Sequence, residues 1–144
     1  MFEKRYNKFR AERQTLPQLI AKCQKLFNGY IRFRDLSGDH FKCISCGQIK
    51  SERFMNCGHF YNVGHYAGLR FNEDNAHGQC IHCNKHLHGN LIEYRDNLFM
   101  KLGAERFENL KLKALYYKRC GHKSHRFEIE QRIEELKAKL VLVK

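Results

Sequence analysis

The chain has 144 residues, a length typical of one domain with short extensions. Lysine and arginine together number 27 against 15 aspartate and glutamate residues, which gives a formal net charge of +12. This excess favours a polyanionic partner, with nucleic acid ahead of an anionic membrane surface. No apolar run approaches the roughly 18 residues that a membrane span needs, and no apolar signal segment follows the charged start, so we expect a cytoplasmic protein.

Residues 1–14 form a basic segment with interleaved aromatic side chains. The aromatic residues are Phe2, Tyr6 and Phe9, and the cationic residues are Lys4, Arg5, Lys8, Arg10 and Arg13. Such a segment is either an arm that becomes ordered against phosphates or the solvated end of a helix. The sequence leaves both interpretations open and somewhat favours the second.

A helix is predicted to begin after Thr15. Thr15, with Gln18 three residues later, has the form of a capping box, and Pro17 fits the first helical turn. Apolar side chains then recur at helical spacing, at Leu16, Ile20, Cys23 and Phe27. Gly29 is the expected end of this helix, and residues 30–35 have no clear assignment.

Two Cys-x2-Cys pairs stand in the middle of the chain. The first is Cys43 with Cys46, and the second is Cys80 with Cys83. Each pair offers two thiolates from a tight turn, and two pairs complete the tetrahedral shell of one zinc ion. Because four thiolates leave no position for a substrate, we expect this zinc to support structure. A disulfide framework is the weaker alternative, since the seven cysteines are odd in number and the compartment is expected to be reducing.

The other three cysteines are not expected to bind this ion. Cys23 falls on the apolar face of the predicted helix and reads as a core residue. Cys57 is a weak alternative to one of the four thiolates. Cys120, His122 and His125 resemble half of a metal site without partners, and the cations around them favour a loop that contacts phosphate.

Three further helices are predicted in the last third of the chain. The first begins with Asn90 as its N-cap and ends at Gly103, and the second spans residues 104–119. The third, residues 127–140, has apolar residues at heptad spacing, so it either packs back on the domain or forms a homodimer contact. The positions expected to face inward are Leu91, Tyr94, Leu98 and Leu102 in the first helix, Phe107, Leu110 and Ala114 in the second, and Ile129, Ile133, Leu136 and Leu140 in the third.

A short strand is predicted over residues 54–61, ending near His59, and a turn over residues 71–77 leads into the second cysteine pair. Together these elements predict an α+β fold with a small zinc-bound treble-clef, or ββα-metal, core between N- and C-terminal helices. We divide the chain into a basic arm and helix over residues 1–41, a core over 42–103 and a basic helical extension over 104–144.

Six short motifs occur together in and around this core. They are Cys43-Ile-Ser-Cys-Gly47, Cys57-Gly-His-Phe60, Leu69-Arg-Phe71, Asn75-x4-Cys80, Cys83-Asn84 and Gly89-Asn90. In combination they resemble the HNH nuclease superfamily and, more narrowly, the phage NinG (Rap) recombination-protein family, over about residues 15–103. The resemblance implies a metal-dependent DNA endonuclease that acts in phage-type recombination, with branched or junction DNA among its substrates.

The resemblance also implies roles for individual residues. His59 matches the general base that takes a proton from water, a role that needs a neutral imidazole near pH 7. Asn75 matches the asparagine that ties the hairpin loop and orients the base. Asn84 falls where a ligand of a catalytic Mg²⁺ or Mn²⁺ is expected, and His88 is four residues further on. Many HNH enzymes carry an Asp or His ligand directly before the base, whereas this chain has Gly58 there.

Two functions of different classes remain open. The first is the endonuclease, and the alternative is a non-catalytic zinc-containing module that binds DNA or mediates recombination. The trio His59, Asn75 and Asn84 favours the nuclease, because a pure binding module has no use for a base, an orienting residue and a hard-metal ligand. Under either function we expect DNA contacts from the cations of the second C-terminal helix, Lys111, Lys113, Lys118 and Arg119.

Overall fold

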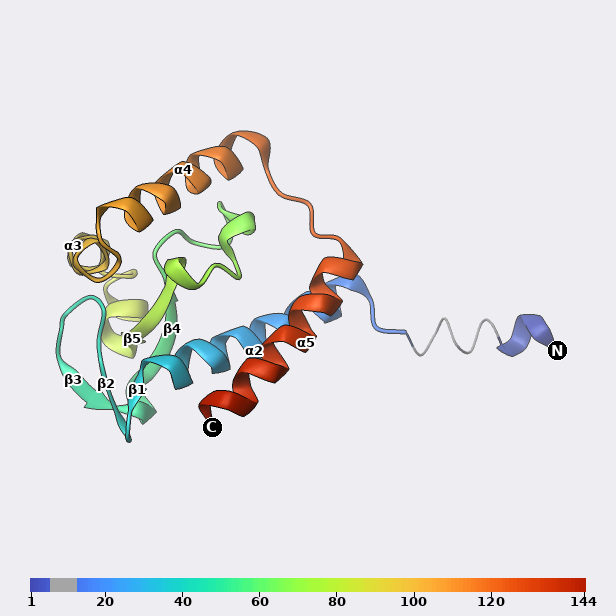
Figure 1. Ribbon diagram of the computed structural model, residues 1–144, viewed down its shortest axis with the longest axis horizontal. Coiled ribbons are helices and arrows are strands. Elements are labelled where there is room, and N and C mark those ends of the chain that lie inside the picture. Colours follow the sequence, from blue (N-terminus) through green and yellow to red (C-terminus); the bar gives the residue numbers. More distant parts are fainter. Residues whose placement is uncertain (6–12) are drawn as a thin grey trace.

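The computed structural model describes residues 1–5 and 13–144 and shows a mixed α+β fold, which confirms the predicted class (Figure 1). Two long helices, α2 (Leu16–Asp35) and α5 (Arg126–Val143), lie side by side, and α3 (Leu91–Leu102) and α4 (Ala104–Cys120) form a second helical pair. The strands are short and antiparallel. The interleaved basic and aromatic pattern at Tyr6, Lys8, Phe9 and Arg10 lies outside the described residues. None of the helices in the described ranges combines the length and the apolarity that crossing a membrane requires.

Helix α2 (Leu16–Asp35) begins as predicted but continues past its expected end. The Thr15 amide donates to Gln18 Oε1 at 2.8 Å and Thr15 Oγ1 accepts from the Gln18 amide at 3.3 Å, so the capping box is confirmed. The predicted stop at Gly29 is wrong. Glycine inside a helix costs only about 1 kcal/mol, whereas continuing the helix buries Ile31, a gain of about 1.5–3 kcal/mol.

Three short strands form an antiparallel sheet in the order β1-β2-β3. They are β1 (Leu36–Ser37), β2 (His40–Lys42) and β3 (Ile49–Ser51). A turn at Gly38, which has a φ of 64°, joins β1 to β2. The chain then passes the first cysteine pair between β2 and β3, so this pair stands on the hairpin that the two strands make.

A second antiparallel ladder joins β4 (Met55–His59) to β5 (Ala76–Cys80). Met55 pairs with Cys80 at one end and His59 pairs with Ala76 at the other. The strand predicted to end near His59 is therefore confirmed. The ladder separates His59 from the second cysteine pair by its full length, which is about 13 Å for five residues.

Helices α3 (Leu91–Leu102) and α4 (Ala104–Cys120) pack against each other across Gly103, whose φ of 78° ends α3 as predicted. Their inward residues are confirmed with one exception, because Leu91 is 47% exposed. Asn90 is not a side-chain N-cap. It has a φ of 43°, and its Nδ2 donates to Cys83 Sγ at 3.5 Å instead.

Helix α5 (Arg126–Val143) packs on α2 through three of its four predicted inward positions, whereas the fourth, Leu140, is only half-buried. Ile129, Ile133 and Leu136 are buried in one cluster with Cys23 and Phe27 of α2. Figure 1 shows the two helices side by side along one edge of the molecule. The packing of this helix on the domain is therefore confirmed, and the alternative of a homodimer contact stays a prediction.

Candidate metal centre and candidate active site

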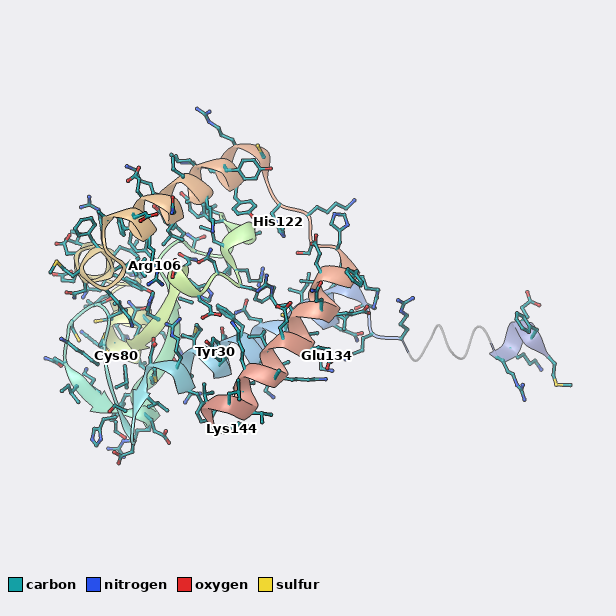
Figure 2. The ribbon with its side chains drawn as sticks, in the orientation of Figure 1. Tyr30, Cys80, Arg106, His122, Glu134 and Lys144 are labelled. Carbon is teal, nitrogen blue, oxygen red and sulfur yellow. The ribbon has the colours of Figure 1, made fainter. Side chains whose placement is uncertain are left out.

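Cys43, Cys46, Cys80 and Cys83 come together into one cluster whose sulfur atoms all lie within 4.8 Å of one another. The Sγ atoms of Cys46 and Cys80 are 4.0 Å apart. Four sulfurs at about 2.3 Å from a tetrahedral zinc ion would stand about 3.8 Å apart, so the spacing suits zinc. Figure 2 labels Cys80, which lies at the end of β5 beside the β2–β3 hairpin. These four cysteines could hold a metal ion such as zinc.

Backbone and side-chain donors point at three of the four sulfurs. The Cys80 amide donates to Cys43 Sγ at 3.3 Å, and the Cys83 amide donates to Cys80 Sγ at 3.4 Å. Asn90 Nδ2 donates to the sulfur of Cys83. Hydrogen bonds to a sulfur favour its thiolate form, which is the form that binds a metal.

A buried polar side chain fastens the two halves of this centre together. Gln79 is 0% exposed, and its Nε2 donates to Ser45 Oγ at 2.7 Å and to the Gly89 carbonyl at 2.6 Å. From α3, Asn97 Nδ2 donates to the Ser45 carbonyl at 2.8 Å. The first cysteine turn is thus held to the turn that follows the second, and to the helix behind it.

The remaining cysteines lie elsewhere. Cys57 is on β4 and packs against the α2–α5 cluster, where burial raises the pKa of its thiol to about 12. The alternative that Cys57 supplies one of the four thiolates is therefore wrong. Cys23 is buried in the same cluster, as predicted, and Cys120 is exposed at the end of α4.

His59 ends β4 with its ring held from two sides. Its Nε2 lies 3.0 Å from the Arg70 carbonyl oxygen, and its ring centroid lies 6.0 Å from that of Phe27 on α2. A carbonyl oxygen can only accept, so Nε2 carries the proton and, in the neutral ring, Nδ1 keeps its lone pair. Burial lowers the pKa of His59 below 6.5, although the hydrogen bond to Arg70 opposes this. The ring is therefore neutral at pH 7, with Nδ1 as its basic atom.

Asn75 ties the loop that follows His59. The side chain is 0% exposed and forms hydrogen bonds with both backbone polar groups of Tyr61. Its Nδ2 also donates to the Leu69 carbonyl at 3.3 Å, and its own carbonyl accepts from the Phe60 amide at 2.9 Å. These bonds fix both ends of the loop that presents the Arg70 carbonyl to His59.

Gly58 has a steric reason to be glycine. A Cβ at this position would lie 2.1 Å from Gln79 Oε1 and 2.8 Å from Gln79 Cβ. Gln79 Oε1 itself has no hydrogen-bond partner among the described residues. Asn56 shares the face of β4 that carries Gly58, because side chains alternate along a strand, whereas His59 points to the opposite face. The position directly before His59 thus offers no metal ligand of its own.

Asn84 follows Cys80, which ends β5 at the end of the ladder opposite His59. Asn84 is half-buried in the helical turn η4 (His82–His86), and His88 is exposed with a φ of 51°. No hydrogen bond between described residues joins either side chain to His59. Within residues 1–5 and 13–144, the four cysteines are the only group of three or more His, Cys, Asp or Glu side chains placed to share an ion.

The four cations predicted to contact DNA do not share one face of α4. Lys111 and Lys118 are seven residues apart and point the same way, whereas Lys113 is turned by about 200° from Lys111. Lys111 lies 3.6 Å from the Glu108 carboxylate, and Arg119 is exposed near the end of the helix. The structure therefore brings together only part of this set.

Lys113 lines a cavity of about 470 Å³ between α4 and α5, together with His122 and Ser124 of the connecting loop. Figure 2 labels His122, which packs on Tyr117 with ring centroids 5.4 Å apart. Glu128 and Glu135 of α5 also line this cavity, so its charges are mixed.

Two residues that shape the site could not be predicted from the sequence motifs. Arg70 contributes through its carbonyl oxygen, which every residue type has, so no residue pattern could indicate it. His77, which has no role in any of the sequence motifs, is 2% exposed and lies 3.3 Å from the Tyr94 hydroxyl, which donates to the Gly58 carbonyl. Burial lowers the pKa of His77 to about 3.

Comparisons with known proteins place the chain in a family. A family model described as "Bacteriophage Lambda NinG protein" matches residues 2–144. Protein ninG of Escherichia phage lambda is 36% identical over 112 residues, which cover 78% of this chain and 49% of that protein. Protein ninG of Escherichia phage 933W is 34% identical over 112 residues, covering 78% of this chain and 50% of that protein. The same protein of Salmonella phage P22 is 34% identical over 112 residues, with 78% and 49% covered.

The chain spans about half the length of the curated relatives it matches. No solved structure matches it. The family model and the relatives confirm the narrower of the two resemblances read from the motifs, and the chain belongs to the NinG family of phage proteins.

Proposed function

We propose that this protein is a divalent-metal-dependent DNA endonuclease of the HNH type that acts in phage recombination. The observation that carries the proposal is the environment of His59, a neutral imidazole whose Nε2 proton is bound by the Arg70 carbonyl. A ring held in one tautomer with a free Nδ1 lone pair is suited to accept a proton from water. Asn75 supports the same role, since its hydrogen bonds hold the loop that carries Arg70.

In the proposed reaction, His59 Nδ1 takes a proton from a water molecule as the water oxygen bonds to the phosphorus of a phosphodiester. The bond from phosphorus to the leaving oxygen breaks, and that oxygen takes up a proton from solvent. A bound Mg²⁺ or Mn²⁺ would stabilise the charge that develops on the leaving oxygen. The resemblance assigns this ion to Asn84 and His88, with water and phosphate oxygens completing the shell, as is usual for Mg²⁺. Asn84 follows the end of the β4–β5 ladder opposite His59, so this assignment rests on the resemblance and not on the geometry.

The alternative is a zinc-containing module that binds DNA or mediates recombination without cutting. One observation favours it, namely the absence of a donor at Gly58, where Gln79 fills the space that a ligand side chain would need. The cysteine cluster suits either function, because a four-thiolate centre supports structure.

A nicking assay separates the two functions. Zinc-loaded protein would be incubated with supercoiled plasmid and with a four-way DNA junction, in Mg²⁺, in Mn²⁺ or in EDTA. The nuclease predicts cleavage that needs an added divalent ion, that His59→Ala abolishes and that His65→Ala, a change at an exposed histidine of the neighbouring loop, leaves intact. Asn84→Ala is expected to raise the metal concentration needed for cleavage. Binding of DNA by the parent without cleavage in either ion would establish the alternative.

A further inference from the structure

An open groove of about 850 Å³ runs along one side of α2. Its lining includes Lys25 and Arg32 of the helix, and Arg70 of the loop that follows η2 (Ala67–Leu69). Gly29 opens the middle of the groove, since a Cβ there would meet nothing within 4 Å. Pro17, Ile20 and Ala21 add an apolar floor at one end.

The charged side chains that line this groove within the described ranges are all positive. Lys25 and Arg32 are exposed, and neither they nor Arg70 form an ion pair with a residue of the described ranges. Among the residues that the structure describes, no carboxylate lines the groove. By contrast, the cavity between α4 and α5 sets Glu128 and Glu135 against its cations. A cation without an ion-pair partner gains more binding free energy from a phosphate than a paired cation does, because it gives up no existing ion pair.

Arg70 joins this groove to His59. Its Nη1 donates to Gln24 Oε1 at 3.2 Å, which holds the guanidinium against α2, while its carbonyl accepts from His59 Nε2. Phe27, on the buried side of α2, packs beside the His59 ring. Arg70 would therefore bind a phosphate with its guanidinium while its carbonyl oxygen holds the proposed base.

We infer that this groove binds a nucleic-acid strand, with Lys25, Arg32 and Arg70 on its phosphates and the apolar floor against sugars or bases. The inference rests on the proposed function and assigns the surface that guides the strand towards His59. It also places the principal DNA contact on α2 and Arg70, and not on α4.

Position 29 offers a test that leaves the helix intact. Gly29→Glu places a carboxylate between Lys25 and Arg32, and Gly29→Gln places a side chain of the same shape without the charge. Both substitutions replace a helical glycine and meet open space, so both should fold at least as well as the parent. Binding would be measured by fluorescence anisotropy with labelled single-stranded and junction DNA in EDTA, which keeps cleavage out of the readout. We expect Gly29→Glu to bind at least about tenfold more weakly than Gly29→Gln at 100 mM salt.

A second pair of variants measures the phosphate contacts directly. Lys25→Gln with Arg32→Gln should reduce the slope of log affinity against log salt by about 1.4–1.8, the value for two lost contacts. Lys118→Gln with Arg119→Gln on α4 is the comparison and should change the slope less. Equal binding by the two position-29 variants, or a loss confined to the α4 variant, would overturn the groove assignment while leaving the nuclease proposal standing. A parent protein that binds no DNA would overturn the proposed function and this inference with it.

Discussion

The side chain of Asn75 binds both backbone polar groups of Tyr61, accepting from its amide at 2.8 Å and donating to its carbonyl at 2.9 Å. These two hydrogen bonds resemble one residue pair of an antiparallel ladder, with a side chain in place of one strand. They close the loop between β4 and β5 beyond the last paired residues of the two strands. Since Asn75 is fully buried, no water can replace these bonds without opening the loop.

Asn75→Ala should therefore lower the free energy of unfolding by about 2–4 kcal/mol, because it leaves buried backbone groups unpaired. Chemical denaturation followed by circular dichroism measures the change. Asn62→Ala is the matched control, since Asn62 is exposed and its Oδ1 accepts only the His65 amide. Similar losses in the two variants would mean that burial of the Asn75 bonds adds nothing.

His59→Ala should reduce the rate of DNA cleavage by about 10²- to 10⁴-fold, the usual cost of losing a positioned general base. Zinc content and DNA affinity should stay close to those of the parent, because the proposed role concerns only the proton of the attacking water. Single-turnover cleavage and anisotropy measure the two effects separately. A variant that cuts at the parental rate would show that another group serves as the base.

The pH dependence of cleavage follows from the lowered pKa of His59, which burial holds below 6.5. The base acts when neutral, so the rate should rise with pH through a pKa below 6.5 and be level at pH 7 and above. The measurement is the single-turnover rate between pH 5 and 8 at saturating metal. A rise centred above pH 7 would contradict a buried, neutral His59.

Removal of the predicted zinc should unfold much of the region between β2 and α3. Cys80→Ser takes away one thiolate of the cluster, and Cys120→Ser, a change at an exposed cysteine, is its control. We expect about one zinc per parent chain by elemental analysis, and a large loss of thermal stability in Cys80→Ser alone, because metal binding and folding are coupled. A zinc-free parent, or a Cys80→Ser protein as stable as the control, would exclude the structural ion.

Gly58→Ala should destabilise the fold by about 1–3 kcal/mol, since the added methyl group would collide with Gln79. Gly29→Ala is the control and should be neutral or stabilising, because its Cβ meets open space. In a double-mutant cycle, Gln79→Gly should remove the part of the loss that is due to the collision. Additive losses at positions 58 and 79 would refute the steric explanation.

Local signals in the sequence predicted local structure well. The capping box of Thr15 and Gln18 correctly predicted the start of α2. The glycine at position 103, which has a φ of 78°, correctly predicted the end of α3. The cysteine spacing was enough to bring four sulfurs together. Each of these features depends on a few residues close in the chain, or on one ion that gathers them.

Features that depend on tertiary packing were not predictable in this way. Glycine is common at helix ends, so Gly29 suggested one, but the burial of Ile31 favours continuing α2 through this position. Asparagine is a favoured N-cap residue, but the Asn90 side chain donates a hydrogen bond to the Cys83 sulfur and does not cap α3. The carbonyl of Arg70 carries no side-chain signature, and it is the packing of the loop that aims it at His59.

The packing of α5 on α2 has a consequence for how the protein acquires its final form. Synthesis yields α2 long before α5, so the apolar face that carries Cys23 and Phe27 is covered only in part, by Phe71 and Ala76, until residues 126–143 have been made. Contacts between such distant segments form slowly, because a long loop must close first. Cys23 and Phe27 thus reach their fully buried state only when α5 docks on α2.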